Sequence, residues 1–132
     1  MIVLDENIWN PRMEDAFRVW YRGQVISINA LRPITLIKDD SIPQLLHRAN
    51  YPTFITINAT DFWRRVPAHR GYCIVTFPFP HERLDELPEL SRQLFRLREF
   101  ASKGTRMGKI VQVTGAQIMY YGLDRQLHRV GW

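Results

Sequence analysis

The chain has 132 residues, 45% of them hydrophobic, and a formal net charge of +5. That length suits a single domain over residues 1–132, and the apolar content excludes a disordered chain. The one cysteine, Cys73, excludes an internal disulfide and a zinc site of several cysteines, and no leader or membrane span is visible, so we expect a cytoplasmic protein without membrane contact.

In the first half of the chain, short apolar runs alternate with segments of helical periodicity. Three of the apolar runs predict strands: residues 2–5, 25–28 and 53–57. A helix is expected over about residues 11–22, because Asn10 suits its N-cap and Gly23 its end. A second helix is expected to begin at residues 39–41 and to end before Pro52.

The second half continues the same alternation. Residues 72–77 predict another strand, with Cys73 as a small core residue. A stripe of leucines predicts the longest helix over about residues 88–103. Residues 109–113 and 116–121 predict a hairpin. Strands that alternate with helices indicate the α/β class, as a three-layer α/β/α sandwich with a mainly parallel central sheet.

Acidic residues recur where predicted strands end or helices begin. They are Asp5, Glu6, Asp39, Asp40 and Asp61. The carboxyl ends of parallel strands meet at one edge of a sheet, so these side chains can converge. Converging carboxylates repel one another unless a hard divalent cation neutralises them, and the pattern therefore predicts a Mg²⁺ or Mn²⁺ site. Any one of these acids, taken alone, also suits a turn or the N-terminal charge of a helix.

Three segments resemble the motifs of the PIN-like domain proteins. They are Leu4-Asp5-Glu6-Asn7, Asp39-Asp40-Ser41-Ile42 and the run from Phe54 to Phe62. The resemblance is strongest to a small bacterial group whose first strand ends in Leu-Asp-Glu-Asn, and it covers roughly residues 1–77. PIN domains are typically metal-dependent ribonucleases, and many are toxins of toxin–antitoxin pairs. The resemblance implies a PIN-like fold and a ribonuclease with Mg²⁺ or Mn²⁺; candidate partners are RNA, an antitoxin protein and a second copy of the chain in a homodimer.

The resemblance also assigns roles to single residues. Asp5, Asp39 and Asp61 match the catalytic acids, with Asp40 as the alternative to Asp39 at the helix start. Glu6 and Asn58 are further metal ligands by the same comparison. Asn58 stands where the family usually has an aspartate, and one extra residue separates it from Asp61. The loss of one negative charge favours an alternative function, a degraded PIN-like scaffold that binds nucleic acid or a partner protein.

Basic residues are concentrated in the second half of the chain. Residues 1–62 carry six Lys/Arg against seven Asp/Glu, whereas residues 63–132 carry twelve against six. Five of these cations are candidate nucleic-acid contacts: Arg64, Arg65, Arg70, Arg106 and Lys109. The first three follow Asp61 in a loop that can reach phosphates near the acids. The alternative for this loop is a solvated segment anchored in the core by Trp63.

Overall fold

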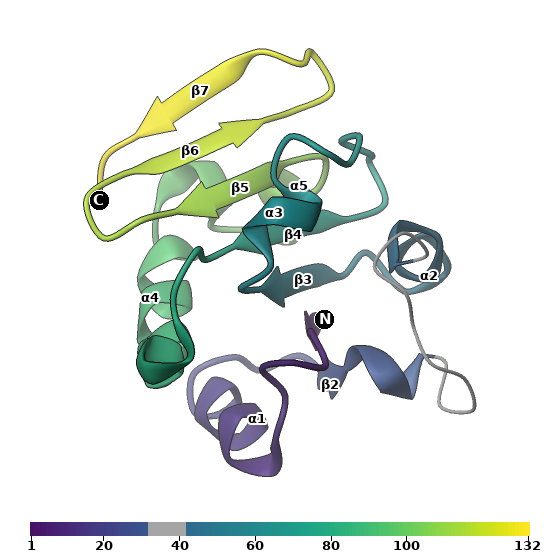
Figure 1. Ribbon diagram of the computed structural model, residues 1–132. Helices are drawn as coiled ribbons and strands as arrows, with labels where there is room; N and C mark the ends of the chain where they lie inside the picture. Colours follow the sequence, from purple (N-terminus) through teal and green to yellow (C-terminus); the bar gives the residue numbers. More distant parts are fainter. Residues whose placement is uncertain (32–41) are drawn as a thin grey trace.

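The computed structural model describes residues 1–31 and 42–132, which contain one seven-stranded sheet (Figure 1). Its strands are β1 (Ile2–Leu4), β2 (Val25–Ser27), β3 (Thr53–Thr56), β4 (Cys73–Thr76), β5 (Ile110–Val113), β6 (Ile118–Tyr121) and β7 (Leu127–Val130). Their order across the sheet is β2-β1-β3-β4-β5-β6-β7. The first five strands pair in parallel, whereas β6 and β7 join in antiparallel fashion.

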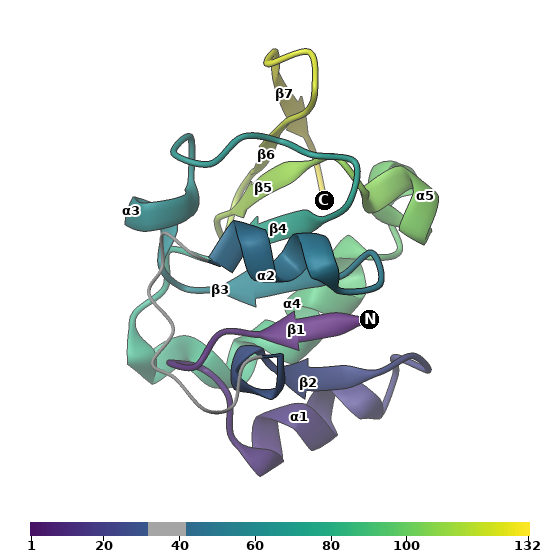
Figure 2. The same cartoon turned by 90° about the vertical axis from the view of Figure 1, so that its right-hand side faces the viewer.

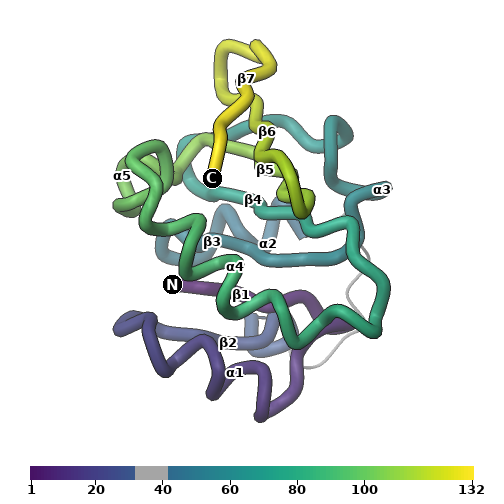
Figure 3. The backbone as a smooth tube through the Cα atoms, turned by 90° about the vertical axis from the view of Figure 1, so that its left-hand side faces the viewer, coloured from purple at the N-terminus to yellow at the C-terminus, as the bar shows by residue number. Residues whose placement is uncertain are grey.

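Helices cover both faces of this sheet. The α-helices are α1 (Pro11–Arg18), α2 (Ile42–Arg48), α3 (Ala59–Phe62), α4 (Leu87–Leu94) and α5 (Lys103–Arg106). Short 3₁₀ helices are η1 (Ile28–Ala30), η3 (His81–Glu86) and η4 (Arg98–Phe100). α1 and α4 lie on one face and α2 lies on the other (Figure 2 and Figure 3). The predicted three-layer α/β/α sandwich with a mainly parallel sheet is confirmed. Of the described helices, none has the length and apolar content to span a membrane.

Each face of the sheet has its own hydrophobic core. Successive side chains of a strand point to opposite faces, so Ile2 and Leu4 pack with α1 and α4, while Val3 packs with α2. All three side chains are fully buried. Burial on both faces explains why the strands read as continuous apolar runs rather than as an alternation of apolar and polar residues.

Helix α1 begins as predicted and ends earlier. The Asn10 side chain accepts a hydrogen bond from the Met13 N–H at 2.7 Å, and proline occupies the first turn. The helix stops at Arg18, whereas the sequence predicted about residue 22. Trp20 and Tyr21 both donate their backbone N–H to the carbonyl of Phe17, which turns the chain and packs their rings against the core.

The predicted helix over residues 88–103 is wrong in length. α4 ends at Leu94, and the chain continues through turns, η4 and α5. The leucine spacing matched a longer helix, but Leu97 and Phe100 reach the core from a chain that is turning back toward the start of β5. Ser102 then opens α5 with a reciprocal capping box with Thr105, which marks a new helix start.

The predicted late hairpin is confirmed, and one strand was not predicted. β5 and β6 pair antiparallel, and the Thr114 N–H donates to the Gln117 carbonyl at 2.9 Å across the turn. β7 pairs with β6 at the sheet edge, where its residues are mostly exposed or half-buried. Because β7 buries so little surface, its sequence contains no apolar run, and the hydrophobic pattern does not predict a strand there.

Candidate metal site and basic pocket

Asp5 lies directly after β1, at the edge of the sheet where β1 and β3 end. Its residue is only 2% exposed. Its Oδ2 accepts a hydrogen bond from Thr56 Oγ1 at 2.6 Å, and its Oδ1 accepts one from the Glu6 N–H at 2.8 Å. The carboxylate is therefore fixed in direction at the carboxyl end of a buried strand.

Asp61 comes to the same edge from α3, which follows β3. β1 and β3 are parallel neighbours with Leu4 opposite Ile55, so the segments that follow them leave the sheet on one side. Asn58 Nδ2 donates to Asp61 Oδ2 at 2.7 Å, and Asn58 Oδ1 accepts from the Asp61 N–H at 3.2 Å. The Asp5 carboxylate and the Asn58 backbone N–H both form hydrogen bonds with the hydroxyl of Thr56.

Thr56 is the residue that connects these acids. Its hydroxyl donates to Asp5 and accepts the Asn58 N–H at 2.9 Å. A continuous hydrogen-bonded chain thus runs from Asp5 through Thr56 and Asn58 to Asp61. We call these four residues the acidic edge. Thr56 was not among the predicted site residues, although it is a polar residue at the end of an apolar strand.

The surroundings of Asp5 disfavour the charged form of its carboxyl group. Burial raises the pKa of the Asp5 carboxyl, and the negative charges of Glu6 and Asp61 raise it further. The hydrogen bonds from Thr56 and from the Glu6 N–H oppose this pKa shift. A buried carboxylate with acidic neighbours is stabilised in its charged form by a nearby cation.

The acidic edge offers oxygen atoms of the type that binds a hard divalent cation. Mg²⁺ and Mn²⁺ prefer carboxylate and carbonyl oxygens, and each carboxylate oxygen of Asp5 keeps acceptor capacity beyond its one hydrogen bond. Glu6 is exposed next to Asp5. The helix-start acids of the prediction, Asp39 and Asp40, lie outside the described residues. Within residues 1–31 and 42–132, no three His, Cys, Asp or Glu side chains are grouped so as to hold a metal ion.

Asn58, which the resemblance assigns to the metal, also makes hydrogen bonds within α3. Its side chain caps α3, and both ends of its amide bond to Asp61. We therefore assign Asn58 to the positioning of Asp61 in this arrangement. The extra residue before Asp61 is what allows this cap, because an N-cap bonds to the N–H three residues later.

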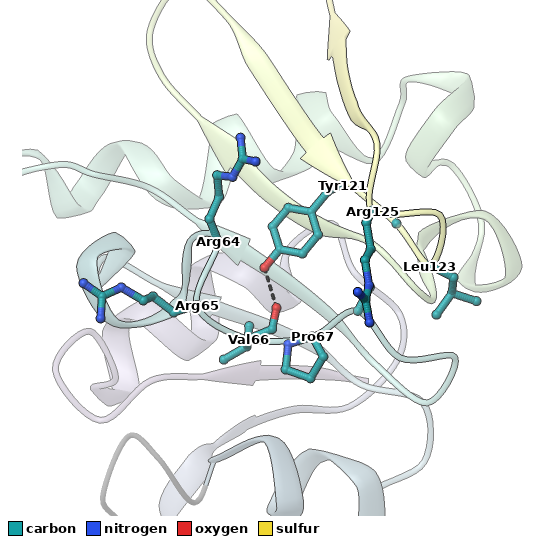
Figure 4. Close-up of a pocket in the computed structure, with 9 residues that line it drawn as sticks. Arg64, Arg65, Val66, Pro67, Tyr121, Leu123 and Arg125 are labelled. Atoms are coloured by element: carbon teal, nitrogen blue, oxygen red, sulfur yellow. Dashed lines mark hydrogen bonds between the residues drawn. The ribbon is translucent and has the colours of Figure 1, made fainter.

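A basic pocket lies just beyond α3, on the same face of the sheet as α2. Its volume is about 480 Å³, and it is formed by the loop of residues 64–68 and the turn between β6 and β7 (Figure 4). Arg64 and Arg65 come from the loop and Arg125 from the turn, and all three are exposed. Tyr121 stands between them, and its hydroxyl donates to the Val66 carbonyl at 2.5 Å. Arg125 was not predicted, because nothing in the sequence connects it to a loop some sixty residues earlier.

The other predicted nucleic-acid contacts lie elsewhere. Arg70 is exposed but does not line the pocket. Arg106 is 6% exposed, stacks on the ring of Phe95, and donates to the Phe100 carbonyl at 3.0 Å. Lys109 donates to the carbonyl of Glu99 at 2.7 Å. Arg106 and Lys109 therefore hold the α5 region against the sheet.

Cys73 is a core residue, as predicted. It is fully buried, and burial raises the pKa of its thiol to about 12. A buried thiol with a raised pKa is not a nucleophile.

The chain matched no protein-family model, no curated protein and no solved structure.

Proposed function

We propose that the protein is a metal-dependent nuclease of the PIN-like kind that acts on RNA, with the acidic edge as its catalytic site. The observation that carries this proposal is the Asp5 carboxylate, which is nearly buried at the end of β1 and linked through Thr56 and Asn58 to Asp61. Two hydrogen bonds offset part of the cost of burying this carboxylate beside other acids, and a hard cation would stabilise its charged form further.

Each residue of the acidic edge has a distinct task in this proposal. Asp5 and Asp61 would hold the cation with their carboxylate oxygens. Thr56 fixes the direction of the Asp5 carboxylate, and Asn58 fixes that of Asp61. Mg²⁺ or Mn²⁺ supplies positive charge beside a phosphodiester and lowers the pKa of a nearby water molecule. These side chains would position the scissile phosphate for hydrolysis, in which a water oxygen bonds to phosphorus, the P–O bond to the leaving ribose oxygen breaks, and that oxygen takes up the proton that water loses.

The test is cleavage of a single-stranded RNA by purified protein, with Mn²⁺ and with EDTA. We expect cleavage only with Mn²⁺, and we expect Asp5→Asn to lower the rate at least about a hundredfold, the size seen when one electrostatic group at a reacting centre is removed. Asp15→Asn is the matched control, because Asp15 is an exposed acid of α1 outside the acidic edge. Equal rates for Asp5→Asn and Asp15→Asn would refute the proposal.

A second candidate function is a PIN-like scaffold that binds RNA without cleaving it. The observation that favours it is the Asn58 amide, which donates directly to Asp61 and removes part of the repulsion that a cation would otherwise relieve. Manganese binding separates the two functions. If the protein is a nuclease, calorimetric titration should show Mn²⁺ binding in the wild type and none in Asp5→Asn. If the protein is a scaffold, its affinity for RNA should be the same with and without Mn²⁺.

A further inference from the structure

The basic pocket beyond α3 is a built feature of the molecule. Two tyrosine hydroxyls hold consecutive carbonyls of its loop: Tyr121 donates to Val66, and Tyr72 donates to Pro67 at 2.7 Å. Trp63 packs against the Tyr121 ring with 5.4 Å between ring centres. The loop is therefore held by β6 and by the residue that precedes β4, and the pocket has a defined wall.

The arginines on opposite sides of the pocket share an unusual backbone conformation. Arg64 has φ of 60° and Arg125 has φ of 63°, the left-handed region that L side chains rarely adopt. Such positions usually carry Gly or Asn, because a long side chain there costs conformational energy. Two arginines in this conformation that line one pocket favour a function for their side chains over a role in folding.

No acidic side chain of the described residues is paired with the arginines of the pocket. Within the described residues, Arg64, Arg65 and Arg125 form no ion pair, and no acid lines the pocket. Asp124 is adjacent to Arg125 in the chain, but its carboxylate accepts from the Gln126 N–H at 3.0 Å and contacts the His128 ring. The three guanidinium groups extend in different directions around the pocket (Figure 4), and an anionic ligand with several oxygens can accept hydrogen bonds from such groups.

From these features we propose that the basic pocket binds one unpaired nucleotide of a single-stranded RNA. The guanidinium groups of Arg64, Arg65 and Arg125 contact its phosphates, while Pro67 and Leu123 offer apolar surface to its base or sugar. A volume of about 480 Å³ lies within the range of small-ligand sites. A base can enter a concave site only when it is not paired, so a duplex is excluded from the pocket.

This inference deepens the proposed function, and the choice of RNA rests on it. Arg64 follows α3 directly after Trp63, so the pocket begins where the segment that carries Asp61 ends. A strand held in the pocket would have its neighbouring phosphates directed along the loop toward the acidic edge. The pocket thus selects single strands, and the acidic edge performs the cleavage.

The experiment measures binding in EDTA, where no cleavage occurs. The probe is a fluorescein-labelled oligouridylate, used as a single strand and annealed to its complement, and followed by fluorescence anisotropy. Arg64→Asn and Arg125→Asn are the test variants, because Asn tolerates the left-handed backbone at both positions. Arg65→Gln tests the third cation. Arg96→Asn is the matched control, since Arg96 is exposed and follows α4 on the other face of the sheet.

We expect each test variant to weaken single-strand binding about three- to tenfold and to lower the salt dependence by about 0.7 per lost phosphate contact. The duplex should bind at least about tenfold more weakly than the single strand, and Arg96→Asn should bind like the wild type. Thermal melts of the same samples verify that the variants are folded. Test variants that bind like Arg96→Asn, or a duplex that binds as tightly as the single strand, would overturn the inference.

The two proposals fail in different ways. If the arginine variants bind normally in EDTA while the wild type still cleaves RNA with Mn²⁺, the pocket inference is wrong and the nuclease stands. If wild-type binding depends on the three arginines but no cleavage occurs with Mn²⁺, the nuclease is wrong and the pocket stands.

Discussion

Asn58 is the residue at which the two candidate functions make opposite predictions. Its amide now donates to Asp61 at 2.7 Å, so Asn58→Asp replaces a hydrogen bond with two carboxylates in contact. In EDTA we expect a loss of about 1 kcal/mol in the free energy of unfolding. With Mn²⁺ we expect roughly tenfold tighter metal binding than in the wild type, because an added carboxylate raises the affinity for a hard cation. Thermal melts and calorimetric titration measure the two effects.

Asn58→Ser is the control for this substitution. Serine keeps a capping oxygen for α3 but neither donates the same bond to Asp61 nor adds a charge. A variant with serine should therefore lose stability without gaining metal affinity. If Asn58→Asp binds Mn²⁺ no more tightly than Asn58→Ser does, residue 58 is outside the metal site and the scaffold function gains support.

The stability of an Asp5 variant with and without Mn²⁺ is a second test of the metal site. In the absence of metal, we expect Asp5→Asn to be as stable as the wild type at pH 7 or more stable, by up to about 1 kcal/mol, because the buried charge beside Glu6 and Asp61 is removed. Addition of Mn²⁺ should raise the melting temperature of the wild type and leave that of the variant unchanged. A variant that melts well below the wild type in EDTA would show that the protein alone stabilises the Asp5 charge.

At the scale of elements, α5 shows how a cation that the sequence assigns to RNA can serve the fold instead. Arg106 donates to the Phe100 carbonyl and to Thr53 Oγ1, and it stacks on Phe95. We expect Arg106→Met to lower the free energy of unfolding by about 2–3 kcal/mol, since two buried acceptors lose their donor. RNA binding measured by anisotropy should not change. If Arg106→Met lowers the RNA affinity and leaves the free energy of unfolding unchanged, Arg106 contacts nucleic acid instead.

The elements also show what a sequence reveals and what it does not. The parallel strands were predictable because burial on both faces demands apolar runs, as in Thr53–Thr56. The end of α4 was not, because the leucine spacing continues while the chain turns at Phe95 to return to the sheet. Asp5 and Asp61 could be placed at one edge from topology alone. Thr56 and Arg125 could not be assigned, since their roles arise from contacts between distant segments.

At the scale of the whole molecule, the loop over the sheet ties its parallel and antiparallel parts together. Tyr121 of β6 holds the loop that joins α3 to β4, through the carbonyl of Val66. Its ring packs against the core on the α2 face. Loss of this bond therefore affects the stability of both parts, and at neutral pH we expect Tyr121→Phe to cost about 1 kcal/mol.

The same tyrosine makes the stability of the molecule sensitive to alkaline pH. Burial is the main cause that raises the pKa of Tyr121 to about 12. In the unfolded chain the hydroxyl ionises near its ordinary pKa of about 10. Between these two pH values the unfolded state loses a proton that the folded state keeps, so the contribution of Tyr121 is complete below pH of about 10 and is lost as the pH rises to about 12. Because the ring is half-exposed, we expect this loss to be about 1–2 kcal/mol.

Urea unfolding of the wild type and of Tyr121→Phe at several pH values tests this expectation. Other groups titrate in both proteins, so the informative quantity is the difference between their free energies of unfolding. The wild type should be the more stable protein at pH of about 8, and its advantage should shrink and then reverse as the pH approaches about 12, since only the wild type has the ionising hydroxyl. If the difference between the two free energies of unfolding is constant across this pH range, Tyr121 has the same pKa in the folded and unfolded states. The loop over the sheet would then not bury the Tyr121 hydroxyl.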